Sequence, residues 1–314
     1  MPLFKKYETA GSGIAKNAPP KKPFFRFWEL VGRKFWKLME VNMMLYLTIL
    51  PLVGAVVCGV QYLASETASP LLLLLAIVLL VAYALIFGPS MAAVTKIFRN
   101  FTLEKPFFLL DTFFKTFRSS FKQAFPMGLI NLLVTTSVVS GGYIYPRIIE
   151  AVQQDGGNPI LFYVMFILTL SIAITVLMMS FYSYLMIVST DLNFRQILKN
   201  ALALSFVALG KNLVTLLIAA LVMGLFIGLT LFYPLIMVFV WFFIPTAFVG
   251  FMIVFNCYPL IQNHIIDPYY AMRGEPSPEM EFAETSGENV FEDQGGKETP
   301  VEPKKKGKKG KLIS

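Results

Sequence analysis

The side chains that most often carry chemistry are sparse in this chain of 314 residues. It has one histidine, His264, and two cysteines, Cys58 and Cys257, which lie far apart in apolar stretches. One histidine excludes a site built from several, and buried free cysteines usually act as small apolar packing residues. The sequence contains no GxxxxGK[ST] phosphate-binding loop and no GxSxG nucleophile motif. We therefore expect a protein that is not an enzyme and needs no cofactor or metal.

Hydroxyl side chains form the densest polar cluster within the long apolar runs. The cluster comprises Thr135, Thr136, Ser137 and Ser140. Such groups can line a path for a neutral solute, but more often they form hydrogen bonds that hold helices together. We interpret the cluster as a helix-packing group, with a polar path as the alternative. The apolar runs contain no Asp, Glu, Lys, Arg or His, which argues against proton coupling and against a charged substrate.

The composition indicates an all-α, polytopic membrane helical bundle. Hydrophobic residues make up 56% of the chain and charged residues 15%, against roughly 25% in soluble domains. Since a helix needs about 20 apolar residues to cross the hydrocarbon core, six transmembrane helices are predicted. Their ranges are 41–63, 70–94, 126–145, 159–188, 213–233 and 236–261.

Prolines set the expected breaks in these helices. The last two spans divide one uncharged stretch, 213–261, at Pro234, where a helix would be interrupted. Pro51 and Pro245 are expected to kink their helices. Gly88-Pro89 is interpreted as the exit of the second helix near the membrane surface.

The distribution of cations predicts the orientation. Of the 27 Lys and Arg residues, all but Arg147 fall in alternate segments, namely 1–40, 95–125, 189–212 and 262–314. The +8 net charge therefore reflects membrane topology, and nucleic acid is not expected as a partner. Because cytoplasmic loops are enriched in Lys and Arg, both termini are predicted to be cytoplasmic.

Amphipathic helices are predicted in three of the basic segments. In 23–40 an aromatic stripe lies opposite a basic one, which is typical of a helix in the membrane interface facing anionic lipid of the inner leaflet. A docking site for a partner is the alternative. The second and third helices, in 110–125 and 194–202, give five candidate residues for docking or lipid contact: Lys115, Arg118, Lys122, Arg195 and Lys199.

The predicted domain organisation has four parts. Residues 1–22 form a flexible basic N-terminus, 23–40 the interfacial helix, 41–261 the six-span membrane domain, and 262–314 a cytosolic disordered tail with a Lys-rich end. Gly224 and Gly228 form a GxxxG motif, which predicts a close helix contact within the chain or with a second copy. The oligomeric state is left open.

Short motifs resemble the YesL family of small bacterial membrane proteins. They are the run Phe87-Gly88-Pro89-Ser90-Met91-Ala92-Ala93, Arg99, the aromatic and basic run 111–125, and 194–202. The resemblance covers roughly residues 24–262. It implies a location in the bacterial plasma membrane and a link to carbohydrate use, because genes for such proteins often lie beside genes for sugar import and breakdown. It implies no catalytic residue.

Three hypotheses for function follow. The first is an accessory component of a carbohydrate-uptake system, with transporter subunits as partners. The second is a self-sufficient facilitator or channel for a small neutral solute. The third is a sensor of membrane state that acts through its interfacial helices.

Overall fold

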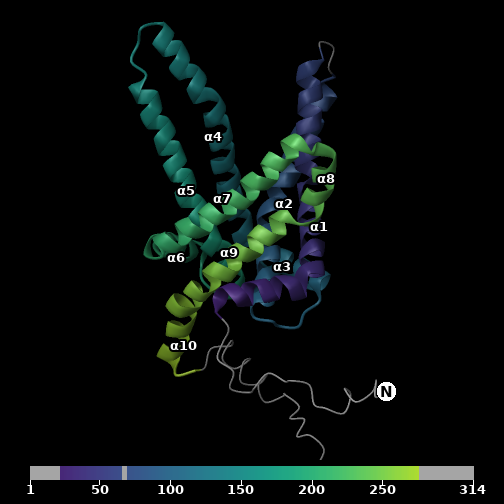
Figure 1. Ribbon diagram of the computed structural model, residues 1–314, viewed down its shortest axis with the longest axis vertical. Helices are drawn as coiled ribbons and strands as arrows, with labels where there is room; N and C mark the ends of the chain where they lie inside the picture. Colours follow the sequence, from purple (N-terminus) through teal and green to yellow (C-terminus); the bar gives the residue numbers. More distant parts are fainter. Residues whose placement is uncertain (1–21, 66–68, 276–314) are drawn as a thin grey trace, which may run out of the picture. The chain divides into compact units, whose positions relative to one another are not determined.

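The computed structural model describes residues 22–65 and 69–275, and within these ranges it is entirely helical (Figure 1). The helices are α1 (Pro23–Ala64), α2 (Pro70–Thr102), α3 (Leu109–Ser119), α4 (Phe121–Gln154), α5 (Ile160–Ser189), α6 (Phe194–Val207), α7 (Leu209–Phe232), α8 (Pro234–Phe243), α9 (Pro245–Ile261), a π-helical segment Gln262–Ile266, and α10 (Asp267–Arg273).

Six helical segments are long and apolar enough to cross a membrane. They are α1, α2, α4, α5, α7 and the segment Pro245–Arg273, which starts with α9. The number of spans predicted from the sequence is therefore confirmed. These helices indicate a multi-pass integral membrane protein.

The basic segments gather at one end of the helices. In Figure 1 the first part of α1, α3, α6 and α10 lie at the lower end, whereas the end of α1, the start of α2 and the turn that joins α4 to α5 lie at the upper end. We call the lower end the basic end. The arrangement agrees with the alternation of charge along the sequence, and the assignment of this end to the cytoplasm stays a prediction.

The helix α1 is continuous through both the predicted interfacial helix and the first predicted span. In Figure 1 its darkest purple part runs across the basic end, and the rest runs along α2. Pro51 lies inside this helix without ending it.

The interpretation of Gly88-Pro89 as a helix exit is wrong, because α2 continues through both residues to Thr102. Gly88 instead lies against α4. A Cβ atom on Gly88 would come 2.1 Å from the carbonyl oxygen of Ala124, and one on Gly128 would come 2.6 Å from the Cα of Gly88. The glycines therefore allow two helix backbones to touch, as small residues commonly do in membranes.

The last predicted span, 236–261, is not one helix. The predicted turn at Pro234 is confirmed, since α7 ends at Phe232 and α8 begins at Pro234. The chain breaks again at Ile244, and α9 begins at Pro245. Proline has no backbone N–H and restricts the residue before it, so Pro245 produces a full break where only a kink was expected.

The helical part of the chain extends beyond the predicted end of the membrane domain. Residues 262–273 form the π-helical segment and α10, which ends at Gly274 with a positive φ of 69°. The predicted disordered tail therefore begins with helix. Its remainder, with the Lys-rich end, and the predicted flexible N-terminus up to residue 21 lie outside the described residues.

The best packed part of the core lies towards the basic end. Its largest fully buried side chains include Tyr182, Tyr258, Phe101 and Phe251. By contrast, the most apolar stretch of α5 has no buried residue, as expected for a helix surface that faces lipid. The buried side chains are thus concentrated towards the end of the helices that also carries the predicted docking residues.

Candidate functional site

The candidate site is a layer at the basic end, made of residues 23–40 of α1, the 103–108 segment, α3 and α6. We call it the basic layer. Each of its helices is amphipathic, so its apolar face packs on the membrane helices and leaves the cations outside.

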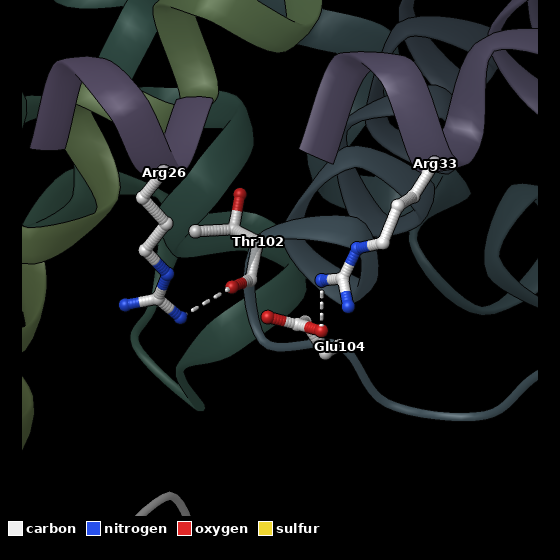
Figure 2. A network of polar contacts seen from close by, with 4 residues as sticks. All are labelled: Arg26, Arg33, Thr102 and Glu104. Atoms are coloured by element: carbon white, nitrogen blue, oxygen red, sulfur yellow. Dashed lines mark hydrogen bonds and ion pairs between the residues drawn. The ribbon is translucent and has the colours of Figure 1, made fainter. Parts of the chain in front are cut away.

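The first part of α1 is held to the segment that follows α2. Arg26 donates a hydrogen bond of 3.4 Å to the backbone oxygen of Thr102, and Arg33 forms an ion pair with Glu104. Figure 2 shows both arginines pointing from α1 towards this segment. One helical turn further on, the Lys37 ammonium lies 5.8 Å from the centre of the Phe107 ring. These contacts fix the segment between α2 and α3 beneath α1.

A cluster of phenylalanine side chains attaches the same part of α1 to α9. Phe27 is 9% exposed. It stacks on Phe251 with 5.5 Å between ring centres and contacts Phe248 and Phe255 at 5.8 and 5.4 Å. Burial of an aromatic ring of this size dominates the energy of such a contact. Four other aromatic residues of this part of α1, Phe24, Phe25, Trp28 and Trp36, are at least half exposed.

In α3 the predicted division into an apolar and a basic face is found. Phe113 is buried, while Lys115 and Arg118 are exposed. Lys115 Nζ lies 2.8 Å from a carboxylate oxygen of Asp111, four residues earlier on the same helix. Lys122 is exposed too, but it belongs to the first turn of α4, because the helix is interrupted at Ser120.

The helix α6 begins at a capping box, in which the side chains of Asn193 and Gln196 each bind the other's backbone N–H. This reciprocal arrangement satisfies donors that a helix start leaves free. Ile197 is fully buried, and the predicted basic residues Arg195 and Lys199 are exposed. All five predicted cations are therefore available at the surface of the basic layer or beside it.

Two side-chain hydrogen bonds join neighbouring helices and segments at the basic end. The ammonium of Lys96 in α2 donates to the backbone oxygen of Val188 in α5, at 3.0 Å. The amide of Gln123 in α4 donates to the backbone oxygen of Leu192, also at 3.0 Å. Buried Asn212 adds a third connection, since it accepts from the Tyr182 hydroxyl and donates to the backbone oxygen of Ser205. The layer is thus held in one arrangement.

The sequence analysis missed Asn42, which is fully buried in α1. Its amide nitrogen donates to the backbone oxygens of Trp241 and Phe242, at 2.8 and 2.9 Å. Its amide oxygen accepts from the backbone N–H of Ala247, at 2.7 Å. One side chain therefore satisfies backbone groups on both sides of the break between α8 and α9. The available signal was an isolated amide in an apolar run.

The four residues of the predicted hydroxyl cluster have different surroundings. Thr135 lines a cavity, whereas Thr136, Ser137 and Ser140 are exposed and do not. Ser137 and Ser140 donate to backbone oxygens of their own helix, at Leu133 and Thr136. Such bonds contribute neither to a path nor to contact with another helix.

The GxxxG motif faces no neighbour within the described chain. A Cβ atom placed on Gly224 or Gly228 would meet nothing within 4 Å. Of the two contacts predicted for this motif, the one within the chain is absent from residues 22–65 and 69–275. The contact with a second copy stays a prediction.

The remaining residues that could take part in chemistry, the two cysteines and the histidine, do not form a cluster. Cys257 is buried and Cys58 half-buried, both as free thiols, and His264 contacts the backbone oxygen of Leu260 at 2.9 Å. In the part of the chain that the structure describes, no three His, Cys, Asp or Glu side chains are grouped so that they could hold a metal ion.

Comparison with known protein families gives a match over part of the chain. Residues 71–140 match a family described as "Protein of unknown function, DUF624". The matched segment runs from α2 through α3 into α4, and it includes the Gly88–Gly128 contact and part of the basic layer. No curated protein matches the chain, and no solved structure matches it.

Proposed function

We propose that this chain is a non-catalytic, multi-pass protein of the bacterial plasma membrane, similar to the YesL proteins, and that it serves as an accessory component of a carbohydrate-uptake system. Both termini and the basic layer lie in the cytoplasm in this proposal. The observation that carries the docking role is the basic layer with the adjoining first turn of α4, where the five predicted cations are exposed on helices whose apolar sides are buried. The link to carbohydrate comes from the family resemblance.

A surface that is already ordered is well suited to docking. Binding costs free energy whenever side chains and loops become fixed, and preorganisation reduces this cost. The bonds from Gln123 and Asn212 hold α4 and α6, which present Lys122, Arg195 and Lys199. The permeases of ABC transporters also present short cytosolic helices to their ATPase, which is an analogy of architecture only.

The anionic inner leaflet is the second proposed partner. Phe24, Trp28 and Trp36 are exposed by 66%, 50% and 74% on the first part of α1, beside exposed Arg and Lys residues. Aromatic rings and cations together favour the boundary between hydrocarbon and head groups. This surface also supports the alternative role as a membrane-state sensor.

The other alternative, a facilitator for a neutral solute, has less support. A sugar path needs several polar groups turned towards one space. Only Thr135 of the predicted cluster lines the cavity, and most of the cavity wall is apolar.

Affinity purification tests the docking role. The full chain, expressed at its native level and extracted in mild detergent, should recover transporter subunits. The variant Lys115→Glu/Arg118→Glu should lose them, because the outer face of α3 changes sign. The matched control is Arg147→Glu, an exposed cation of α4 outside the basic layer. If no transporter subunit is recovered with the unchanged chain, the docking role is wrong.

Growth after deletion of the gene tests the link to carbohydrate. On a panel of single carbon sources, a defect confined to one sugar or oligosaccharide is expected. Full growth on every carbohydrate, together with altered sensitivity to membrane stress, would instead favour the sensor.

A further inference from the structure

A cavity of about 540 Å³ lies within the membrane-spanning part of the chain, between α2, α4, α5 and α9. Its volume is within the range of about 300–1,000 Å³ found for ligand pockets. Its wall is formed mainly by aliphatic and aromatic side chains, among them Met91, Phe98, Val138, Leu170 and Val254. The proposed docking role does not use this space.

On α4 the cavity lies at the depth predicted for the hydrocarbon core, and on α2 it extends to Phe98, beyond the predicted end of that span at residue 94. On α4 it extends from Asn131 to Val139, and the helix rises about 1.5 Å per residue. These residues therefore lie about 7 to 20 Å along α4 from Pro126, where the predicted span begins, inside a core about 30 Å thick. The medium next to the cavity is lipid.

Four of the polar side chains that line the cavity, Asn131, Ser180, Tyr184 and Thr95, already have partners. Ser180 donates a hydrogen bond of 2.7 Å to the amide oxygen of Asn131, and the Asn131 amide donates to the Tyr184 hydroxyl at 3.2 Å. Thr95 donates to the backbone oxygen of Met91 at 2.7 Å. A sugar or another polar solute would leave most of its own hydroxyls without partners here, which is costly in an apolar site.

The cavity is continuous with the lipid-facing surface. Val139, Ile174 and Leu177 line it, and the same side chains are 70%, 44% and 46% exposed on α4 and α5. Opposite them, Phe98 and Val254 are only 2% and 4% exposed. The space thus has an open side towards the bilayer and a closed wall formed by α2 and α9.

We propose that this cavity binds one hydrocarbon chain of a bilayer lipid, which enters from the membrane past α4 and α5. The apolar wall, the paired side chains of Asn131, Ser180 and Thr95, and the open side towards lipid all match an acyl chain. Bound lipid of this kind would support the α4–α5 pair, which is joined to α2 mainly at the Gly88–Gly128 contact and the basic end.

Photocrosslinking in nanodiscs tests the proposal. The full-length protein is reconstituted with a phosphatidylcholine that carries a diazirine in one acyl chain, irradiated, and mapped by peptide mass spectrometry. Crosslinks to the closed wall, at Met91, Phe98 or Val254, are expected in addition to those on outward-facing residues. Crosslinks confined to outward-facing residues would overturn the proposal.

A filling variant provides the second arm. Ala173→Trp places an indole in the cavity from α5 and should reduce crosslinking to the closed wall at least fivefold. The control Ala220→Trp adds the same ring to an exposed position of α7 and should leave it unchanged. Val138→Trp fills the cavity from α4 and replaces the first variant if that one does not give a monodisperse protein.

A third measurement separates lipid from water as the occupant. In a Cys58→Ala/Cys257→Ala background, Ser180→Cys should stay unreactive towards a charged, water-soluble maleimide, because a thiol in an apolar cavity remains protonated and only the thiolate reacts. Rapid reaction with the water-soluble reagent would show a hydrated cavity and would overturn the proposal, while leaving the docking role untouched.

Discussion

The amide oxygen of Asn42 in α1 accepts a hydrogen bond of 2.7 Å from the backbone N–H of Ala247, 205 residues further along the chain. The same amide donates to two carbonyl oxygens at the end of α8. Backbone groups at a helix break inside a membrane have no water to bind, so interrupted membrane helices depend on partners from neighbouring helices. Asn42 supplies these partners for both ends of the break.

Replacement of Asn42 by alanine should therefore be strongly destabilising. Three backbone groups would lose their partner, and each unsatisfied buried group costs about 1–3 kcal/mol, partly relieved by rearrangement. We expect a loss of about 2–4 kcal/mol and a clearly lower unfolding temperature in detergent. The control is Asn256→Ala, which removes one long bond of 3.4 Å from an exposed position. Equal unfolding temperatures for the two variants would contradict the role of Asn42.

Two glycine variants separate close packing from the GxxxG motif. Gly88→Ala should destabilise the protein, because its Cβ would collide with the backbone of α4 at Ala124. Gly224→Ala should leave the monomer as stable or up to about 1 kcal/mol more stable, since alanine favours helix more than glycine does. Thermal unfolding of monomeric protein measures both. If Gly224→Ala is the more harmful of the two, the observed packing is wrong.

The Gly224→Ala variant also tests the contact with a second copy. If two chains meet at this motif, crosslinking in membranes should show a dimer that the variant loses without any loss of monomer stability. An unchanged dimer would exclude the motif as the contact.

The backbone conformation of Glu104 gives a further prediction. It has a positive φ of 55° at the end of α2, a conformation that costs most residues about 1 kcal/mol and costs glycine little. Its ion pair with Arg33 is half-exposed and contributes about 0.2–1 kcal/mol. Glu104→Gly and Glu104→Ala both remove the pair, but the glycine variant should be more stable by about 1 kcal/mol. The same unfolding assay decides, and an alanine variant of equal or greater stability would contradict this account of the turn.

Much of the fold could be predicted because local pattern determines it. Long apolar runs, Pro234 and the spacing of Phe113 with Lys115 and Arg118 indicated the spans, one turn and an amphipathic helix. Each of these signals is contained in a short stretch of sequence.

The features that were missed depend on contacts between distant residues. Asn42 acts on a break about 200 residues away, and Gly88 looked like a helix exit because its partner, Gly128, lies on another helix. The hydroxyl cluster around Thr135 is divided for a related reason: four polar residues within six positions of a helix point in different directions, so only Thr135 lines the cavity.

The proposed topology has six membrane spans, with the basic layer in the cytoplasm, and the docking role depends on it. Cysteine accessibility tests it most directly, with single cysteines at Lys199 in α6 and at Asp155 in the turn between α4 and α5, in a background without Cys58 and Cys257. In intact cells an impermeant maleimide should label Asp155→Cys, and it should label Lys199→Cys only after the membrane is permeabilised. Labelling of Lys199→Cys in intact cells, with Asp155→Cys protected, would reverse the orientation and contradict the account.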